Sequence, residues 1–234
     1  MATPPEWGAL PFWNNRAPPQ DLPAVPDSID WRTHGIVSPV KNQGSCRSDW
    51  AFSAVGVVES HLAKRTGHLV EFSEQQMVDC VSSEGCSEGS TYGGLKFVES
   101  MGLQGSVFYP YTGQQGMCKY NRHNVVARIN GIVQIYGGEN AMRDAVGKFG
   151  PIAVGLDLDP SVYRSGILDG PNCSTTTTFN AIIVRYGTEA GKDYWIVKMS
   201  LGPNWGENGY LRIVRNKNMC GIDQIALYPT FLDF

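Results

Sequence analysis

Long apolar runs, clustered positive charge and histidine are all scarce in this sequence of 234 residues. No stretch approaches the roughly 18 consecutive apolar residues of a membrane-spanning helix, so we expect no membrane insertion. The net charge is −3 and the basic residues are scattered, which gives no electrostatic footprint for nucleic acid. Four histidines are present and none follows residue 123, so the second half of the chain contains no imidazole.

The cysteines argue against a metal site. The sequence has six of them, with no Cys-x-x-Cys pair and no histidine at ligand spacing from one, so we expect neither a metal nor a cofactor. An even number fits an oxidising compartment in which every cysteine forms a disulfide. Six cysteines can pair in many ways, and their spacing alone does not choose among them.

Helical periodicity dominates the first half of the chain. Apolar residues between 49 and 65 recur at i, i+3, i+4, i+7 and i+11, which predicts a helix packed on one face. A capping-box pattern predicts a second helix over 73–79, and a third is expected over 91–101. Residues 1–24 contain six prolines and follow no period, which predicts an extended arm.

After about residue 111, short β-branched and aromatic runs separated by Gly, Pro and Asn predict strands instead. One helix, 139–148, is expected among them. A helical part, 25–111, followed by a β-rich part, 112–234, predicts an α+β protein of two lobes. The predicted strands are 132–136, 152–156, 181–186, 194–198 and 210–214.

The most specific motif lies at the start of the first predicted helix. Residues 43–50 read Gln-Gly-Ser-Cys-Arg-Ser-Asp-Trp. They resemble the segment Gln-Gly-Ser-Cys-Gly-Ser-Cys-Trp of papain-like cysteine peptidases, in which the second cysteine is the nucleophile; Asp49 stands in its place. The resemblance extends over residues 25–234 and implies a cathepsin L-like fold: a helical left lobe, an antiparallel β-barrel right lobe and a cleft between them. Residues 1–24 would then be either a linker or the tail of a prosegment.

Two further motifs resemble the segments that carry the other catalytic groups of this family. Residues 179–187 match His-Ala-Val-x-x-Val-Gly-Tyr-Gly, and the ungapped match puts Phe179 at the histidine. A slip of one residue would put Asn180 there, but it would turn every side chain of the strand to the other face. Met199 replaces the orienting asparagine, whereas Gln43 keeps the oxyanion-hole donor; a structural hydrogen bond is the alternative role for Gln43. His34, His61, His68 and His123 are expected to be surface or structural residues.

The resemblance also implies the disulfide pairs Cys46–Cys86, Cys80–Cys118 and Cys173–Cys220. It further implies a peptide groove in which Gly89 pairs with the bound backbone and the main side-chain pocket is lined by Ser90, Thr91, Gly155, Asn180 and Ile225. Extended peptides bind such grooves through main-chain hydrogen bonds, which do not require catalysis. Asn172-Cys173-Ser174 is a sequon, which makes Asn172 a candidate glycosylation site.

Asp49 admits several interpretations. A carboxylate at a helix N-terminus is stabilised by the backbone amides and the dipole, so Asp49 is expected to be ionised with a depressed pKa and to act as a cap. It could also contact a ligand together with Arg47. Hydrolysis that uses Asp49 as nucleophile or base is disfavoured, because a depressed pKa makes a poor base at neutral pH.

The sequence therefore predicts a catalytically inactive, non-enzymatic homologue of the papain family that acts as a binding, decoy or regulatory protein. Expected partners are peptides, cystatin-like inhibitors or a prosegment, and we expect a monomer in an extracellular or endolysosomal location. The alternatives are a hydrolase of altered chemistry and a structural or storage protein.

Overall fold

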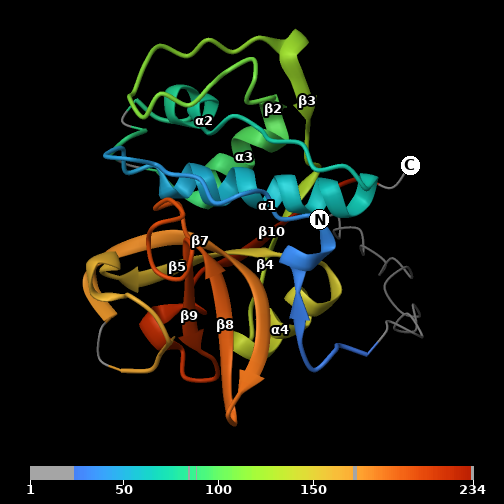
Figure 1. Cartoon of the computed structure of the whole chain (residues 1–234). Helices are drawn as coiled ribbons and strands as arrows, with labels where there is room; N and C mark the ends of the chain where they lie inside the picture. The colour runs from blue at the N-terminus through green and yellow to red at the C-terminus, as the bar shows by residue number, and fades with distance from the viewer. Residues whose placement is uncertain (1–23, 84, 88, 171–172, 233–234) are drawn as a thin grey trace, which may run out of the picture.

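The computed structural model describes residues 24–83, 85–87, 89–170 and 173–232. The predicted arm, apart from Ala24, and the sequon residue Asn172 lie outside these ranges. Three helices form one layer, shown in the upper part of Figure 1: α1 (Asp49–Thr66), α2 (Glu74–Cys80) and α3 (Thr91–Met101). The fourth helix, α4 (Gly138–Lys148), lies apart from them beside the sheet.

The predicted helix starts and ends are confirmed, and local chemistry explains them. Ser73 accepts a hydrogen bond from the backbone N of Gln76, and Ser90 does the same for Gly93, so hydroxyls cap α2 and α3. Gly67 ends α1 with a φ of 76°, a left-handed conformation that glycine adopts without a Cβ clash.

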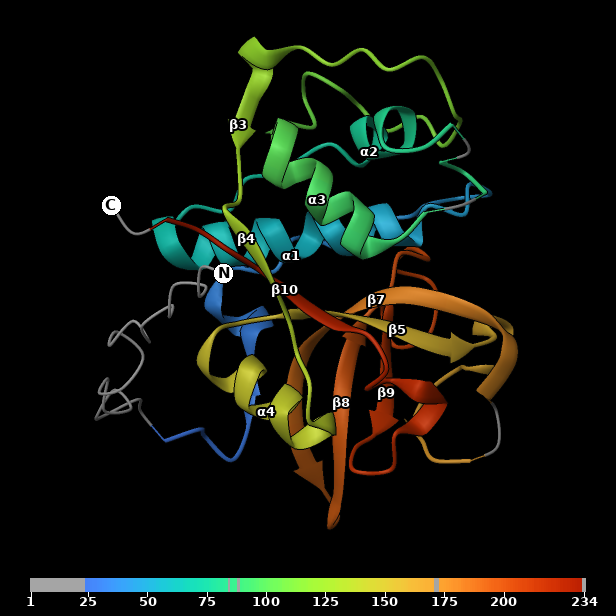
Figure 2. The same ribbon diagram turned by 180° about the vertical axis from the view of Figure 1, so that it is seen from behind.

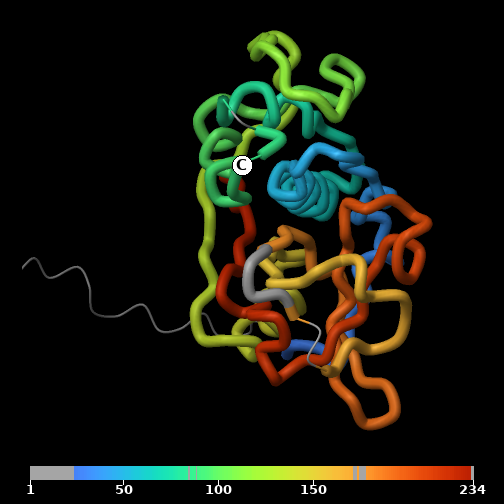
Figure 3. Tube along the Cα trace, turned by 90° about the vertical axis from the view of Figure 1, so that its left-hand side faces the viewer, coloured from blue at the N-terminus to red at the C-terminus, as the bar shows by residue number. Residues whose placement is uncertain are grey.

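Helix α1 is more deeply enclosed than its apolar stripe predicts. Thirteen of its 18 residues are buried, including Asp49 and Glu59, so both faces of the helix are covered. Figure 3 views the chain from the side and shows α1 between the other helical segments and the strands. Polar side chains of α1 are therefore held between the two layers.

The main sheet has eight strands. Seven of them follow the order β4-β10-β5-β7-β8-β9-β6, and β1 pairs with β7 outside this path. The pair β6–β9 is parallel and the other pairs are antiparallel. The strands are β1 (Ile29–Asp30), β4 (Gly131–Gln134), β5 (Ile152–Leu158), β6 (Ile167–Leu168), β7 (Cys173–Glu189), β8 (Lys192–Lys198), β9 (Tyr210–Val214) and β10 (Ala226–Thr230).

The α+β class is confirmed, and where an antiparallel barrel was expected the described residues form an open sheet. Within the described residues the sheet is mixed and stays open, because its end strands β4 and β6 do not pair with each other. A smaller sheet joins β2 (Leu103–Gln104) to β3 (Val125–Ala127) near the helices. The predicted lobe boundary at residue 111 stays a prediction.

The sheet separates two hydrophobic cores, and the alternation of side chains along β7 assigns each residue to one of them. Ile182 and Val184 belong to the core shared with α1 and α3, whereas Phe179, Ala181 and Ile183 belong to the core on the α4 side. Figure 2 shows α4 next to β4 and β10 on this second side. Because the pleat has a period of two, Asn180 faces the helices and Phe179 faces away from them.

The three predicted disulfides are confirmed: Cys46–Cys86, Cys80–Cys118 and Cys173–Cys220. They leave no free cysteine among the described residues. None of the helices in the described part of the chain combines the length and the apolar character of a membrane span.

His61 of α1 makes the stability of the fold depend on pH. Its ring stacks on Tyr228 and its Nε2 lies 2.8 Å from the carbonyl oxygen of Pro151. Burial lowers the pKa of His61 from 6.5 to about 4. The folded protein therefore binds fewer protons here than the unfolded chain, so stability decreases as the pH falls from about 6.5 to about 4.

We expect His61→Gln to remove this loss, because Gln keeps a donor for Pro151 but does not titrate. The full difference in pKa corresponds to about 3 kcal/mol, and because the residue is partly exposed we expect about 2 kcal/mol between pH 7 and 4. Urea denaturation of variant and parent at both pH values measures it. The exposed His123→Gln is the matched control, and an unchanged pH dependence in His61→Gln would contradict the assignment.

Candidate functional site

Asp49 occupies the first position of α1, at the junction of the two layers. Its side chain is buried, and Oδ2 accepts two hydrogen bonds from Asn180 of β7: one from the backbone N at 2.7 Å and one from Nδ2 at 2.9 Å. These contacts join residues 131 positions apart in the sequence. The carboxyl group therefore faces the opposite strand and is not simply a helix cap.

The expected depressed pKa of Asp49 is wrong. Burial raises the pKa above its usual range, although the hydrogen bonds from Asn180 and the charge of Arg47 act in the opposite direction. Removal of water penalises the ionised form more than these groups favour it. Asp49 thus takes up a proton at a higher pH than an exposed aspartate does.

Asn180 bridges the two layers with both ends of its side chain. Nδ2 donates to Asp49, while Oδ1 accepts from Thr91 Oγ1 at 3.0 Å, at the start of α3. Next to it, Ser53 of α1 donates to the carbonyl oxygen of Ala181 at 2.9 Å. The helical layer and strand β7 are thus joined directly at the site.

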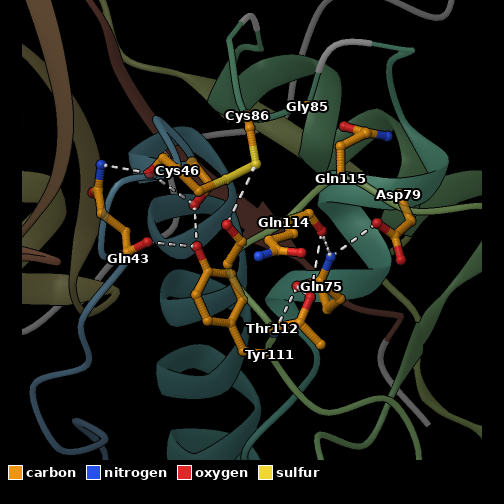
Figure 4. Close-up of a disulfide and its surroundings, with 12 residues drawn as sticks. Gln43, Cys46, Gln75, Asp79, Gly85, Cys86, Tyr111, Thr112, Gln114 and Gln115 are labelled. Atoms are coloured by element: carbon orange, nitrogen blue, oxygen red, sulfur yellow. Dashed lines mark hydrogen bonds between the residues drawn. A yellow bond between two sulfur atoms is a disulfide. The ribbon is translucent and has the colours of Figure 1, made fainter.

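Gln43 is held by structural hydrogen bonds within the site. Nε2 donates to the carbonyl oxygen of Cys46 at 3.1 Å, and Oε1 accepts from Ser200 Oγ at 2.6 Å. The Tyr111 hydroxyl donates to the backbone oxygen of Gln43 at 2.8 Å, next to the Cys46–Cys86 disulfide (Figure 4). These contacts agree with the alternative role of Gln43, a structural hydrogen bond. Its role as an oxyanion-hole donor stays a prediction.

Phe179 and Met199 lie in the core on the α4 side, with exposed fractions of 7% and 2%. Leu201 packs against the same core. All three side chains therefore pack in or against this one core. Their equivalence to catalytic residues of the family stays a prediction.

In the described part of the chain, no histidine is among the hydrogen-bond partners of Asp49 or the charges that shift its pKa. His61 follows it by 12 residues on the same helix, about 18 Å along the axis at 1.5 Å per residue. His34, His68 and His123 are exposed, and only His34 among them has a ring contact in the described structure, with Trp31. Among the described residues no His, Cys, Asp and Glu side chains gather into a possible metal site.

A surface depression of about 250 Å³ opens above Asp49 and is lined by residues of both layers. Position 89 admits only glycine, because a Cβ there would lie 2.1 Å from the Trp50 ring. Trp50, Ser87 and Thr178 line the depression but were not among the predicted groove residues. Each lies within two positions in the sequence of a predicted site residue, Asp49, Gly89 or Phe179, and this closeness could have indicated them. The lining residues are Arg47, Asp49, Trp50, Ser87, Gly89, Thr178 and Asn180.

The predicted side-chain pocket is only partly assembled. Gly155 is the register partner of Asn180, and its N donates to the carbonyl oxygen of Ile225 at 3.2 Å. Thr91 is buried against Asn180, whereas Ser90 is exposed and Ile225 is 41% exposed. The structure thus brings Thr91, Gly155 and Asn180 together, with Ile225 at the rim.

A buried cluster of charged side chains supports the site from within, and sequence reasoning missed it. Lys41 Nζ lies 2.8 Å from Glu59 and 2.7 Å from Glu74, and Lys198 Nζ donates to Ser38, which in turn donates to Glu59. Burial lowers the pKa of Lys198 to about 8, and burial together with Glu59 raises the pKa of Glu74 to about 7. Since its members are far apart in sequence, only the folded chain reveals the cluster.

Known proteins resemble this chain over most of its length. The sequence model of a family described as "Papain family cysteine protease" matches residues 25–230. A cathepsin L-like proteinase of Fasciola hepatica is 42% identical over 90% of this chain and 67% of its own length, and cathepsin S of Mus musculus is 41% identical over 88% and 64%. The chain thus spans about two thirds of these curated relatives.

Among solved structures, digestive procathepsin L 3 from the larval midgut of Tenebrio molitor matches with a TM-score of 0.84 and 36% identity. The match covers 95% of this chain and 73% of the procathepsin. It confirms the predicted papain-like fold. Together with three disulfides, which form in oxidising compartments, these relatives place the protein in an extracellular or endolysosomal setting.

The prediction that the protein is not an enzyme is contradicted by these relatives. They are named proteinases and cathepsins, and they share about 40% of their residues with this chain over nearly its whole length. The prediction relied on single positions, Asp49, Phe179 and Met199, while similarity over some 200 residues points to a peptidase.

Proposed function

Since this chain belongs to the papain family of cysteine peptidases, we propose that its cleft binds extended peptides and that Asp49 stands where the family has its thiol. The observation that carries the proposal is the depression above Asp49, to which Trp50 and Gly89 contribute from the helical layer and Thr178 and Asn180 from β7.

The chemistry of this depression suits an extended backbone. Gly89 is exposed and carries no side chain, so a peptide can approach its main chain. Arg47 and Ser87 offer donors at the rim, whereas the Thr178 hydroxyl donates to Asp157 at 2.7 Å and keeps its oxygen as an acceptor; all three residues are exposed. Peptide and prosegment ligands share this extended form, and the structural neighbour is a procathepsin.

We expect Thr178→Trp to weaken the binding of peptides at least about tenfold, because an indole would fill the depression. Fluorescence anisotropy with labelled hexapeptides measures this dissociation constant. Asn140→Trp, an exposed position on α4 outside the depression, is the matched control. Absence of binding in the parent protein, or equal binding by parent and Thr178→Trp, would contradict the proposal.

A second candidate function is peptide hydrolysis through the Asp49 carboxyl group. Two observations favour it: the relatives are named proteinases, and burial raises the pKa of Asp49, which suits proton transfer in mildly acidic solution. The test is turnover of fluorogenic peptides between pH 4 and 8 by the parent and by Asp49→Asn. Turnover lost in Asp49→Asn with binding retained would support this candidate, whereas turnover that survives the substitution would exclude Asp49 as the reacting group.

A further inference from the structure

The Asn180 side chain is fixed at both ends, and this limits the space next to it. Its Oδ1 lies 3.0 Å from Thr91 Oγ1 and its Nδ2 lies 2.9 Å from Asp49 Oδ2. Atoms at hydrogen-bond distance leave no room for a third group between them. The passage between the start of α3 and strand β7 is therefore closed at Asn180.

On the Gly155 side of Asn180 the structure leaves little other space. Gly155 lies opposite it in the strand pairing, and a Cβ on Gly155 would already lie 3.2 Å from Thr178 Cγ2 and 3.5 Å from Ile225 Cδ1. A bulky peptide side chain that entered here would have to displace Asn180. That movement would leave the buried Thr91 hydroxyl and the Asp49 carboxyl without these partners.

We infer that Asn180 sets the side-chain selectivity of the groove: peptides with a small residue such as Ala or Ser next to Gly155 bind, and those with a bulky apolar residue there are rejected. The inference rests on the proposed function, because it presupposes that the groove binds peptide. It names the ligand class of that same site. The hydrogen-bonded bridge from Asp49 through Asn180 to Thr91 carries the inference.

The test is a positional scan of labelled hexapeptides, Ala in every position except one, which is Ala, Ser, Leu or Phe. At one position we expect Phe to weaken binding to the parent protein at least about tenfold relative to Ala. Asn180→Ala should abolish this discrimination by opening the space. Thr91→Val, which keeps the volume but removes the hydroxyl, should reduce it, and Asn140→Ala should leave it unchanged.

The possible results separate the two proposals. Binding that tolerates Phe at every position of the peptide, or discrimination that persists unchanged in both Asn180→Ala and Thr91→Val, would overturn the inference while peptide binding stands. Failure of every peptide to bind both the parent and Asn180→Ala would overturn the proposed function and the inference with it. Circular dichroism of each variant verifies that it is folded.

Discussion

The triple variant Asp49→Cys/Phe179→His/Met199→Asn is expected to cleave fluorogenic peptides at least about a hundredfold faster than the single variant Asp49→Cys. A thiol attacks efficiently only as a thiolate, and an adjacent imidazole both removes its proton and later protonates the leaving amine. A positioned base contributes about 10²- to 10⁴-fold. The nearest histidine on α1, His61, follows Asp49 by about 18 Å, so the single variant lacks such a base.

The family motifs assign these positions, and it is the backbone of β7 that brings position 179 next to the site. Phe179 precedes Asn180, whose backbone N lies 2.7 Å from the Asp49 carboxylate, and Phe179 and Met199 share one core, so an imidazole and an amide at these positions would lie in the same cluster. The matched control is Asp49→Cys/Met199→Asn, which lacks the imidazole and should resemble the single variant. A double variant as fast as the triple would show that position 179 does not supply the base.

Replacement of Glu59 by Ala is expected to lower the free energy of unfolding by about 3–5 kcal/mol. Glu59 is 1% exposed and accepts hydrogen bonds from Lys41 Nζ, Ser38 Oγ and the backbone N of Phe72. Its loss would remove a nearby negative charge from the buried Lys198, whose hydrogen-bond partner in the described structure is the Ser38 hydroxyl. Removal of one member of a buried ion cluster leaves uncompensated charge in a region of low polarity.

Urea denaturation of the disulfide-intact protein measures this loss. The variant Glu59→Ala/Lys198→Met should recover part of it, because it removes the ammonium group that Glu59 offsets. Glu99→Ala breaks the exposed pair with Lys96 on α3 and should leave the denaturation midpoint unchanged. A loss below about 1 kcal/mol in Glu59→Ala would show that the cluster is better hydrated than its burial indicates.

Local sequence was sufficient wherever neighbouring residues decide the structure. The four longer helices follow from apolar periodicity and from caps such as Ser73 and Ser90, which act within three residues of themselves. Short strands such as β6 and β10 carry no comparable signal, because their pairing with β9 and with β4 and β5 depends on distant segments. Local sequence could not decide between a barrel and an open sheet for the same reason.

The sequence by itself determined that Asp, Phe and Met occupy positions 49, 179 and 199, and its motifs identified the family and the three disulfides. The motifs alone did not give the functional class. The three substituted positions suggested a non-enzyme, whereas the similarity of the whole chain to named proteinases indicates a peptidase. Only the tertiary structure decided the state of Asp49. The helix N-terminus alone predicts a depressed pKa, but burial between the two packed layers raises it, and the hydrogen bonds from Asn180, 131 residues away, oppose this rise only in part.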